Sequence, residues 1–296
     1  MNFKYSVDKI KLEFQYVKKD RTQSFLDRFS YSSNSDGWYT SSALTKCRHN
    51  YLFGDEDSRI YLGIEPNWKT SSKYDNSIIL EFNPNKVNPF LIDDLMWLRG
   101  YPLALIRVCS FDLAIDMGID YKLLRMAKRD VRESFCKFGK RYTETQYLGQ
   151  LGHNHIKLYN KAVEQKIKDV NWSRFEITVK EINSLSCSLS EFEDSIKLPK
   201  LYYLQEQLDF GYSELDDIQR IVLESIISDI SVLYTIKNYR TRKKYEQLLF
   251  KFLNSVDINI NDMYKAYIDY ANTFTGSQTF TADVDFHAFL LKNQTF

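Results

Sequence analysis

The chain has 296 residues, enough for one large domain or two smaller ones, and this length excludes a peptide-sized module. Its 40 Lys and Arg residues nearly match its 39 Asp and Glu residues, so any DNA site must arise from local clustering of charge. Four cysteines without Cys-x-x-Cys spacing argue against zinc fingers, and the absence of a long apolar run predicts a soluble, cytoplasmic protein.

The first third of the chain has the pattern of a sheet. Apolar and charged residues alternate from residue 6 to 16, which predicts a strand with one solvated face. Residues 30–58 are rich in Ser, Asn and Asp, which is typical of a hairpin loop before a strand at 59–64; DNA contact is a less favoured alternative. Another strand is predicted at 78–82. Apolar spacing at 89–100 then predicts a short amphipathic helix.

Two carboxylates lie on the most apolar strand pattern of the chain, residues 103–117. Asp112 and Asp116 share one face of this strand, with the small Ala114 between them. Buried carboxylates are costly unless they are ion-paired or bind a metal, and Ala114 leaves room for an ion. The spacing therefore favours metal ligation, and neutralising both acids should leave the fold intact. The alternative is ion pairing of the two carboxylates with Arg107 and Lys157.

The densest basic stretch of the first half follows at residues 121–136. Apolar residues recur there with a period near 3.6, which predicts an amphipathic helix that covers the sheet. A charge run on a helix is usually only its solvated face. This one lies between two strands with polar faces, so it is also a candidate track for DNA phosphates. The arginines of this track are Arg125, Arg129 and Arg132.

A tyrosine ends the next polar strand face. Ile156 and Leu158 alternate with His155, Lys157 and Tyr159, which predicts a strand with one apolar and one polar side. Tyr159 lies on the polar side and precedes Asn160-Lys161, where its hydroxyl could meet a phosphate. Tyrosine is common in this chain, at 21 residues, so a tyrosine without catalytic function is the alternative. The pair His153 and His155 is an alternative metal site.

Beyond residue 180 the pattern changes from strand to helix. Residues 172–180 predict a strand with Arg174 and Glu176 on one face, and helical spacing dominates from there to the end. Basic residues interleaved with Tyr239 and Tyr245 suit a duplex or hairpin surface. The basic residues of this cluster are Lys237, Arg240, Arg242, Lys243 and Lys244.

Four ordered blocks of the chain, between about residues 75 and 245, resemble the Rep_trans family of plasmid rolling-circle replication initiators of the staphylococcal type. The most specific block contains Tyr147-Leu148-Gly149, then Ile156-Lys157-Leu158-Tyr159-Asn160-Lys161, then Glu164. The other blocks are Glu81-Phe82-Asn83-Pro84-Asn85-Lys86, Asp112-Leu113-Ala114-Ile115-Asp116 and Arg174-Phe175-Glu176. Ser110 departs from the family pattern, which has an arginine at that position.

The resemblance implies an α+β fold, in which a mainly antiparallel nicking domain covered by helices (residues 1–183) precedes a mostly helical region for origin recognition and dimerisation (184–296). It also implies that Tyr159 attacks one DNA strand, which gives a 5′-phosphotyrosyl link and a free 3′-hydroxyl. A divalent ion, Mg²⁺ or Mn²⁺, would be held by Asp112, Asp116 and Glu81. Lys157 and Lys161 would add positive potential. Supporting roles are expected for Glu164, Arg174, Glu176 and His155.

The expected partners are double-stranded origin DNA, the single-stranded nick site, a second copy of the chain and a host helicase. Two other functions stay open from the sequence. One is a conjugative relaxase that nicks a transfer origin, which shares the same chemistry. The other is a non-catalytic origin-binding protein, which would need the basic clusters but neither Tyr159 nor the acids.

Overall fold

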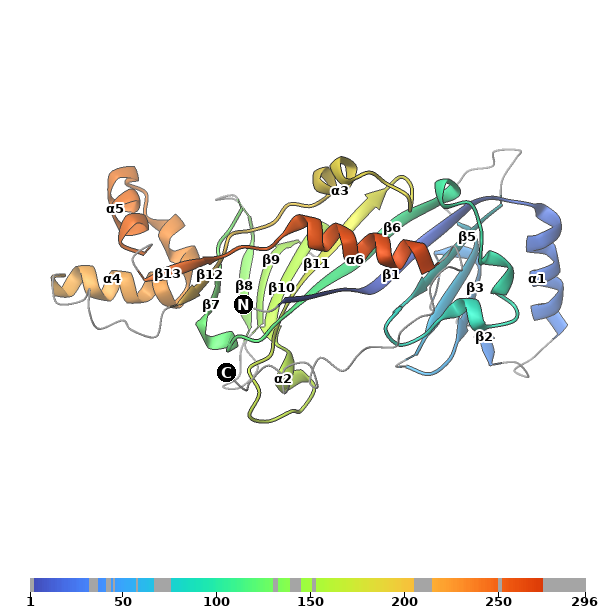
Figure 1. Ribbon diagram of the computed structural model, residues 1–296, viewed down its shortest axis with the longest axis horizontal. Helices are drawn as coiled ribbons and strands as arrows, with labels where there is room; N and C mark the ends of the chain where they lie inside the picture. The colour runs from blue at the N-terminus through green and yellow to red at the C-terminus, as the bar shows by residue number, and fades with distance from the viewer. Residues whose placement is uncertain are drawn as a thin grey trace. The chain divides into compact units, whose positions relative to one another are not determined.

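The computed structural model describes residues 3–31, 37–40, 44, 46–56, 58–66, 76–129, 133–138, 145–150, 153–204, 215–249 and 252–273. It is an α+β structure with a large antiparallel sheet and several helices, as expected (Figure 1). The chain divides into two compact units. Unit 1 comprises Met1–Lys4, Ile115–Ile177 and Ile196–Asn259, and unit 2 comprises Tyr5–Ala114, Thr178–Ser195 and Ile260–Phe296. Each unit therefore contains residues from before and from after position 183, where the sequence predicts the domain boundary.

Unit 2 is built on antiparallel strands in the order β2-β3-β4-β5-β1, and β6 follows β1. These strands are β1 (Phe3–Val17), β2 (Trp38–Thr40), β3 (Cys47–Phe53), β4 (Ile60–Pro66), β5 (Asn76–Phe82) and β6 (Ile106–Met117). The apolar face predicted at 6–16 is confirmed, because Ile10, Leu12 and Phe14 of β1 are fully buried. Strands β2 and β3 lie where only a loop was expected, because β3 pairs with β4 and β2 pairs with β3.

The opposite face of β1 departs from the expected solvated pattern. Glu13 lies on that face but is fully buried, and its carboxylate accepts a hydrogen bond from Nε of Arg107 on β6, at 2.7 Å. A buried carboxylate is tolerated when it is paired in this way. Arg107 is therefore bound to Glu13, which the alternation of residues 6–16 could not reveal.

Helices α1 (Lys19–Tyr31), α3 (Leu189–Ser195) and α6 (Ile260–Thr273) also belong to unit 2. Figure 1 shows α6 lying along β6. The Phe111 ring of β6 is 5.2 Å from the Tyr267 ring of α6 and 6.2 Å from the Phe192 ring of α3. The Tyr267 hydroxyl donates to the carbonyl of Leu185, at 3.0 Å. The C-terminal helix therefore completes the core around β6.

The amphipathic helix predicted at 89–100 is wrong. Two 3-10 turns occur instead, η1 (Pro89–Leu91) and η2 (Met96–Leu98), followed by η3 (Leu103–Leu105) before β6. Asn88 caps η1 by accepting from the Phe90 amide, and the extended conformation of Ile92 ends it after one turn. The apolar spacing is used all the same, because Leu95 and Leu98 are fully buried. Two short turns place these leucines as well as one helix would.

Unit 1 contains two groups of antiparallel strands. One has the order β11-β10-β9-β8, and the other has the order β13-β12-β7. Helices α4 and α5 and the 3-10 helix η6 pack on the second group through Leu223, Ile226, Tyr245 and Leu249. The elements are β7 (Leu124–Met126), β8 (Phe135–Phe138), β9 (Thr145–Gln150), β10 (His153–Asn160), α2 (Lys161–Glu164), β11 (Ser173–Ile182), β12 (Leu201–Leu204), α4 (Asp217–Ser228), η6 (Ile230–Thr235), α5 (Tyr239–Leu249) and β13 (Leu253–Val256).

The helix predicted at 121–136 is also wrong. The segment forms a single 3-10 turn, η4 (Tyr121–Leu123), and then strands β7 and β8. Strand β7 pairs with β12, and its Met126 amide donates to the side chain of Gln146, at 3.2 Å. These distant partners outweigh the local helical period. The basic residues of this segment therefore do not share one helix face.

The region after residue 183 contains the expected helices α4, α5 and α6, but strands β12 and β13 interrupt it. Strand β12 pairs with both β13 and β7, so this region is less helical than its sequence pattern suggests. No helix in the described residues is long and apolar enough to cross a membrane.

Candidate active site

Tyr159 lies next to last in β10, on the polar face that the sequence predicts. Ile156 and Leu158 of the same strand are fully buried on the other face. Tyr159 is partly exposed and lies opposite Arg174 of β11 and Thr145 of β9. Residues directly opposite one another in a sheet have their side chains on the same face. The structure therefore brings Tyr159 and Arg174 together on one face of the sheet.

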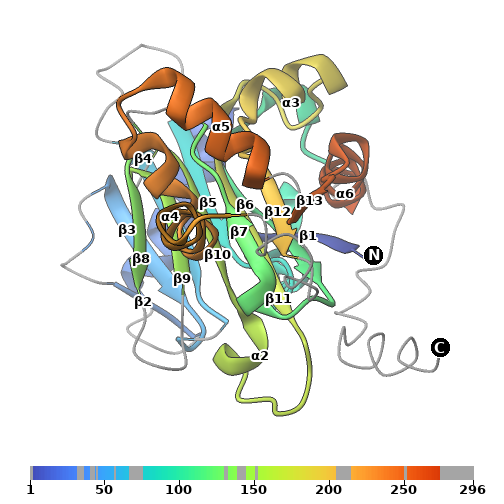
Figure 2. The same ribbon diagram turned by 90° about the vertical axis from the view of Figure 1, so that its left-hand side faces the viewer.

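The residues after Tyr159 fix the end of the strand. Asn160 caps α2, with its side-chain oxygen accepting from the Val163 amide at 3.1 Å (Figure 2 shows α2 at the end of β10). The Trp172 carbonyl accepts from the amides of Lys161 and Ala162, at 2.8 and 3.1 Å. These bonds turn the chain directly after the tyrosine, which explains the local need for Asn160.

Lys161 lies close to the tyrosine. Its Nζ is 5.7 Å from the centre of the Tyr159 ring, and the lysine is only 9 % exposed. Its ammonium also forms an ion pair with Glu164. Burial alone would raise the pKa of Glu164, but the hydrogen bond and charge of Lys161 outweigh it and lower that pKa. Lys161 and Glu164 therefore act as one ion pair at the start of α2.

Lys157 occupies the same face two residues before Tyr159. It lies opposite Glu176 on β11, and its Nζ is 3.2 Å from the Glu176 carboxylate. Glu176 is almost completely buried, whereas the Lys157 side chain is 35 % exposed. This ion pair links β10 to β11 beside the tyrosine.

Asp116 and Arg174 form the most buried ion pair of the site. Arg174 Nε donates to one carboxylate oxygen and Nη2 to the other, both at 2.7 Å. Trp172 Nε1 also donates to the first oxygen, at 2.7 Å. Asp116 is 1 % exposed and Arg174 is 7 % exposed. Two parallel bonds to both oxygens hold a guanidinium in one orientation, and here that guanidinium lies opposite Tyr159.

The three acids predicted to bind a metal are engaged separately. Asp116 is bound by Arg174, and one oxygen of Asp112 accepts from the Thr178 hydroxyl at 2.6 Å. Glu81 lies on β5, which β1 separates from β6, and its carboxylate is 2.7 Å from Lys9. Burial would raise the pKa of Glu81, but Lys9 and other lysines lower it.

The described part of the chain contains no group of three or more His, Cys, Asp or Glu side chains that could hold a metal. The alternative of ion pairing needs different partners from those expected, because Arg107 binds Glu13 and Lys157 binds Glu176. The requirement for a divalent metal ion stays a prediction.

His155 lies on the same face as Lys157 and is almost completely buried. Its ring stacks on the Tyr147 ring, with 5.2 Å between the ring centres. Burial and then the charge of Lys157 lower the pKa of His155, so the neutral imidazole is favoured. The side chain of His153 lies outside the described residues.

Sequence reasoning missed Trp172. Its indole binds Asp116 and its carbonyl caps the turn after Tyr159. No spacing rule predicts this double contact. The only signal is that Trp172 lies two residues before Arg174, at the start of the predicted strand.

The arginines of the expected phosphate track are bound to protein acceptors. Arg125 donates to the carbonyls of Ile227 and Leu124. Arg129 forms an ion pair with Glu133 and donates to the Lys197 carbonyl at 2.8 Å. Arg132 lies outside the described residues. The structure does not place Arg125 and Arg129 on a helical track.

Four of the five residues of the second basic cluster lie on one helix. Arg240, Arg242, Lys243 and Lys244 lie on α5, and Lys237 precedes it; all are exposed except Arg242, which is partly buried. Asn238 caps the helix by accepting from the Thr241 amide. Tyr239 is 62 % exposed, with the Arg242 guanidinium 5.7 Å and the Lys243 ammonium 5.9 Å from its ring centre.

Comparison with known proteins adds little to this geometry. No family model and no curated protein matches the chain. One similar solved structure is described as a rolling circle replication initiator protein from Geobacillus stearothermophilus. It is 12 % identical, the alignment covers 93 % of this chain and 97 % of that chain, and the TM-score is 0.37. A likeness of this strength carries no argument about the site.

Proposed function

We propose that the chain initiates rolling-circle replication by nicking one strand of its origin through Tyr159. One observation carries the proposal: Tyr159 lies at a capped strand end, partly exposed, with Lys161 beside its ring and Arg174 opposite it. The sequence of this strand, Ile156-Lys157-Leu158-Tyr159-Asn160-Lys161, is also the block that most resembles the Rep_trans initiators.

The proposed reaction is a transesterification. The Tyr159 oxygen forms a bond to phosphorus while the bond between phosphorus and the 3′ oxygen breaks. The products are a 5′-phosphotyrosyl link and a 3′-hydroxyl, which receives a proton and can be extended by a polymerase. One phosphoester bond replaces another, so no ATP is needed and the strand can be rejoined at termination.

Lys161 is the residue that we assign to the developing charge. A tyrosine with a pKa of about 10 is a weak nucleophile at neutral pH, and a nearby ammonium favours its ionised form. A phosphate can compete for Lys161, because the Glu164 side chain in its ion pair is 48 % exposed. The Asp116 side chain is only 2 % exposed, so it stays bound to Arg174. Arg174 is therefore a positioning residue in this proposal.

A bound Mg²⁺ or Mn²⁺ would polarise the scissile phosphate and offset the charge that develops there. The exposed cluster on α5 would bind the origin duplex through its phosphates. The resemblance suggests three further partners: the single-stranded nick site, a second copy of the chain and a host helicase.

The test is a nicking assay on a supercoiled plasmid that carries the chain's own origin, with and without Mg²⁺ or Mn²⁺. Tyr159→Phe should bind the origin normally and fail to form the open circle, because only the hydroxyl is removed. Tyr147→Phe, on the neighbouring strand, is the matched control and should nick. Normal nicking by Tyr159→Phe overturns the assignment. Origin binding by a wild-type chain that never nicks would indicate a non-catalytic origin-binding protein.

A further inference from the structure

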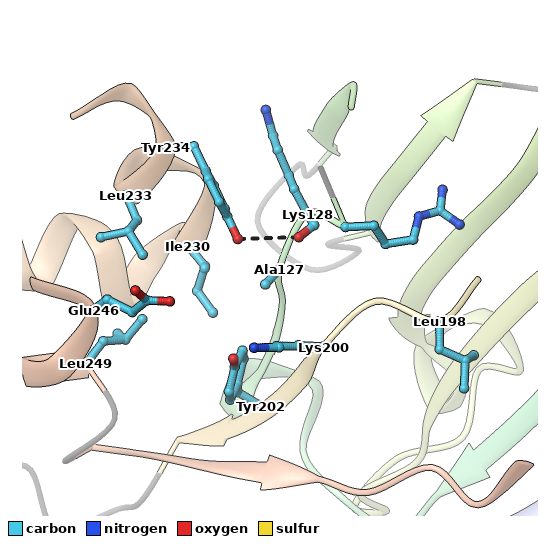
Figure 3. A pocket seen from close by; sticks show the side chains of 11 residues that line it. Ala127, Lys128, Leu198, Lys200, Tyr202, Ile230, Leu233, Tyr234, Glu246 and Leu249 are labelled. Atoms are coloured by element: carbon cyan, nitrogen blue, oxygen red, sulfur yellow. Dashed lines mark hydrogen bonds between the residues drawn. The ribbon is translucent and has the colours of Figure 1, made fainter. Parts of the chain in front are cut away.

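Unit 1 contains a cavity of about 280 Å³ that is remote in sequence from Tyr159. Its walls come from α5, η6, β12 and the segment that follows β7 (Figure 3). Apolar side chains form part of the wall, and two tyrosines, Tyr202 and Tyr234, add aromatic surface. The apolar members are Ala127, Leu198, Ile230, Leu233 and Leu249.

One carboxylate, Glu246, and three basic side chains, Lys128, Arg129 and Lys200, line this cavity. Figure 3 shows Glu246 reaching toward it from α5 and Lys200 reaching toward it from the other side. In the part of the chain that the structure describes, neither side chain forms an ion pair. Arg129 also lines the cavity, but Glu133 and the Lys197 carbonyl bind its guanidinium. Lys200 and Glu246 are therefore available to a ligand.

The tyrosines remain neutral hydroxyl groups near the carboxylate. Burial, followed by the charges of Tyr234 and Glu246, raises the pKa of Tyr202 to about 12. Burial and then Glu246 also raise the pKa of Tyr234, whose hydroxyl donates to the Lys128 carbonyl at 3.3 Å. The wall thus presents one carboxylate acceptor, cationic donors that include Lys200, and flat aromatic surface.

We propose that this cavity takes up a single guanine base. Guanine has two adjacent donors, N1–H and N2–H, which one carboxylate can accept together. It also has the acceptors O6 and N7, the pair to which lysine and arginine side chains most often donate in specific DNA contacts. Adenine, cytosine and thymine each lack two adjacent donors that one carboxylate could accept together. The volume lies just below the range of drug-sized pockets, which suits one base.

The surroundings of Glu246 point to nucleic acid rather than to another planar ligand. Glu246 belongs to α5, whose preceding residues include Arg240, Lys243 and Lys244 in exposed positions. Exposed Tyr239, with two cations beside its ring, extends the same surface. A strand held there by its phosphates could place one unstacked base into the cavity, where flat and apolar side chains contact its faces. The inference deepens the proposed origin recognition but does not depend on nicking by Tyr159.

Isothermal titration calorimetry of the full chain with the four deoxynucleoside monophosphates tests the proposal. Deoxyguanosine monophosphate should bind more tightly than the other three. Glu246→Gln and Lys200→Met should each weaken its binding by about 5- to 150-fold, the range for a specific base contact. Glu224→Gln, an exposed change on α4, is the matched control and should bind like wild type. Far-ultraviolet circular dichroism verifies that each variant folds.

Oligonucleotides distinguish the source of the base. Hairpins with one unpaired guanine or one unpaired thymine should bind wild type with different affinities and Glu246→Gln with equal affinities. Guanine-selective binding of the mononucleotide without hairpin discrimination supports the cavity, with a free nucleotide as its ligand. Equal binding of all four mononucleotides, or equal binding to wild type and Glu246→Gln, overturns the proposal. Tyr159→Phe should behave like wild type in every arm, so a failure of the nicking assay leaves this test unaffected.

Discussion

The Tyr159 strand and the α5 surface both carry lysines and arginines, but they use these residues differently. Beside Tyr159 the three cations have carboxylate partners: Lys157 has Glu176, Lys161 has Glu164 and Arg174 has Asp116. On α5 most of the cations lie at exposed positions, and two of them lie beside the ring of Tyr239. Paired cations hold a geometry, whereas exposed ones attract phosphates over a distance. The first arrangement suits chemistry and the second suits affinity.

The largest expected effect breaks a buried pair. Asp116→Ala leaves the guanidinium of Arg174 buried without its counter-charge, which should lower the free energy of unfolding by about 3–5 kcal/mol. Urea denaturation measures this difference. The control is Asp217→Ala, which removes an exposed ion pair with Arg220 on α4 and should cost less than about 1 kcal/mol. Equal losses in the two variants would show that the Asp116 pair does not support the site.

The next effect concerns DNA affinity. Replacing Arg242, Lys243 and Lys244 with Ala should weaken origin binding. For every DNA phosphate that is no longer neutralised, the slope of log affinity against log salt should become flatter by about 0.9. Lys265→Ala, at an exposed position on α6, should leave the slope unchanged. A short single-stranded oligonucleotide with the nick site should still be cut. If cleavage of this oligonucleotide falls as far as origin binding, nicking and origin binding are not divided between the Tyr159 strand and the α5 surface.

A smaller effect depends on pH. The folded state lowers the pKa of His155, so the unfolded chain binds the proton more readily. The free energy of unfolding should therefore decrease as the pH falls below 6.5, the ordinary value for histidine. His155→Gln should lose less stability than wild type between about pH 7.5 and about pH 5.5. An identical pH dependence in the two proteins would contradict this sign.

The smallest effect comes from the Lys161–Glu164 pair, the most exposed of the three ion pairs beside Tyr159. Glu164→Gln should change the free energy of unfolding by less than about 1 kcal/mol, because the Glu164 side chain is about half exposed and solvent screens its charge. It should, however, free Lys161 for phosphate and strengthen binding of the nick-site oligonucleotide at low salt. Glu191→Gln, an exposed change on α3, is the control. Weaker oligonucleotide binding by Glu164→Gln would mean that Glu164 orients Lys161.

Strands β1 and β10 could be predicted from alternation, because Ile10 and Leu12 of β1, and Ile156 and Leu158 of β10, repeat with a period of two on a buried face. The position of Tyr159 on the polar face followed from the same rule. The helix at 121–136 could not be corrected from the sequence, because β7 is fixed by partners in β12, about 75 residues away. Local spacing carries no information about such partners.

Asp116 shows that, at the site too, local spacing does not reveal distant partners. Its partner Arg174 is 58 residues away, and the sequence placed both residues on polar faces without pairing them. From spacing alone, neutralising Asp112 and Asp116 is expected to leave the fold intact. The ion pair changes this expectation for Asp116, because its loss would leave the buried Arg174 without a counter-charge.

The packing of α6 has a consequence for synthesis. Phe111 emerges from the ribosome long before Tyr267, the ring that covers it, and at about 5–20 residues per second the interval is on the order of 10–30 s. During that time the apolar surface of β6 lacks its final cover. Unit 2 therefore assembles only after the C-terminal helix has been made, and a chain truncated before Ile260 should be recovered mainly as aggregate.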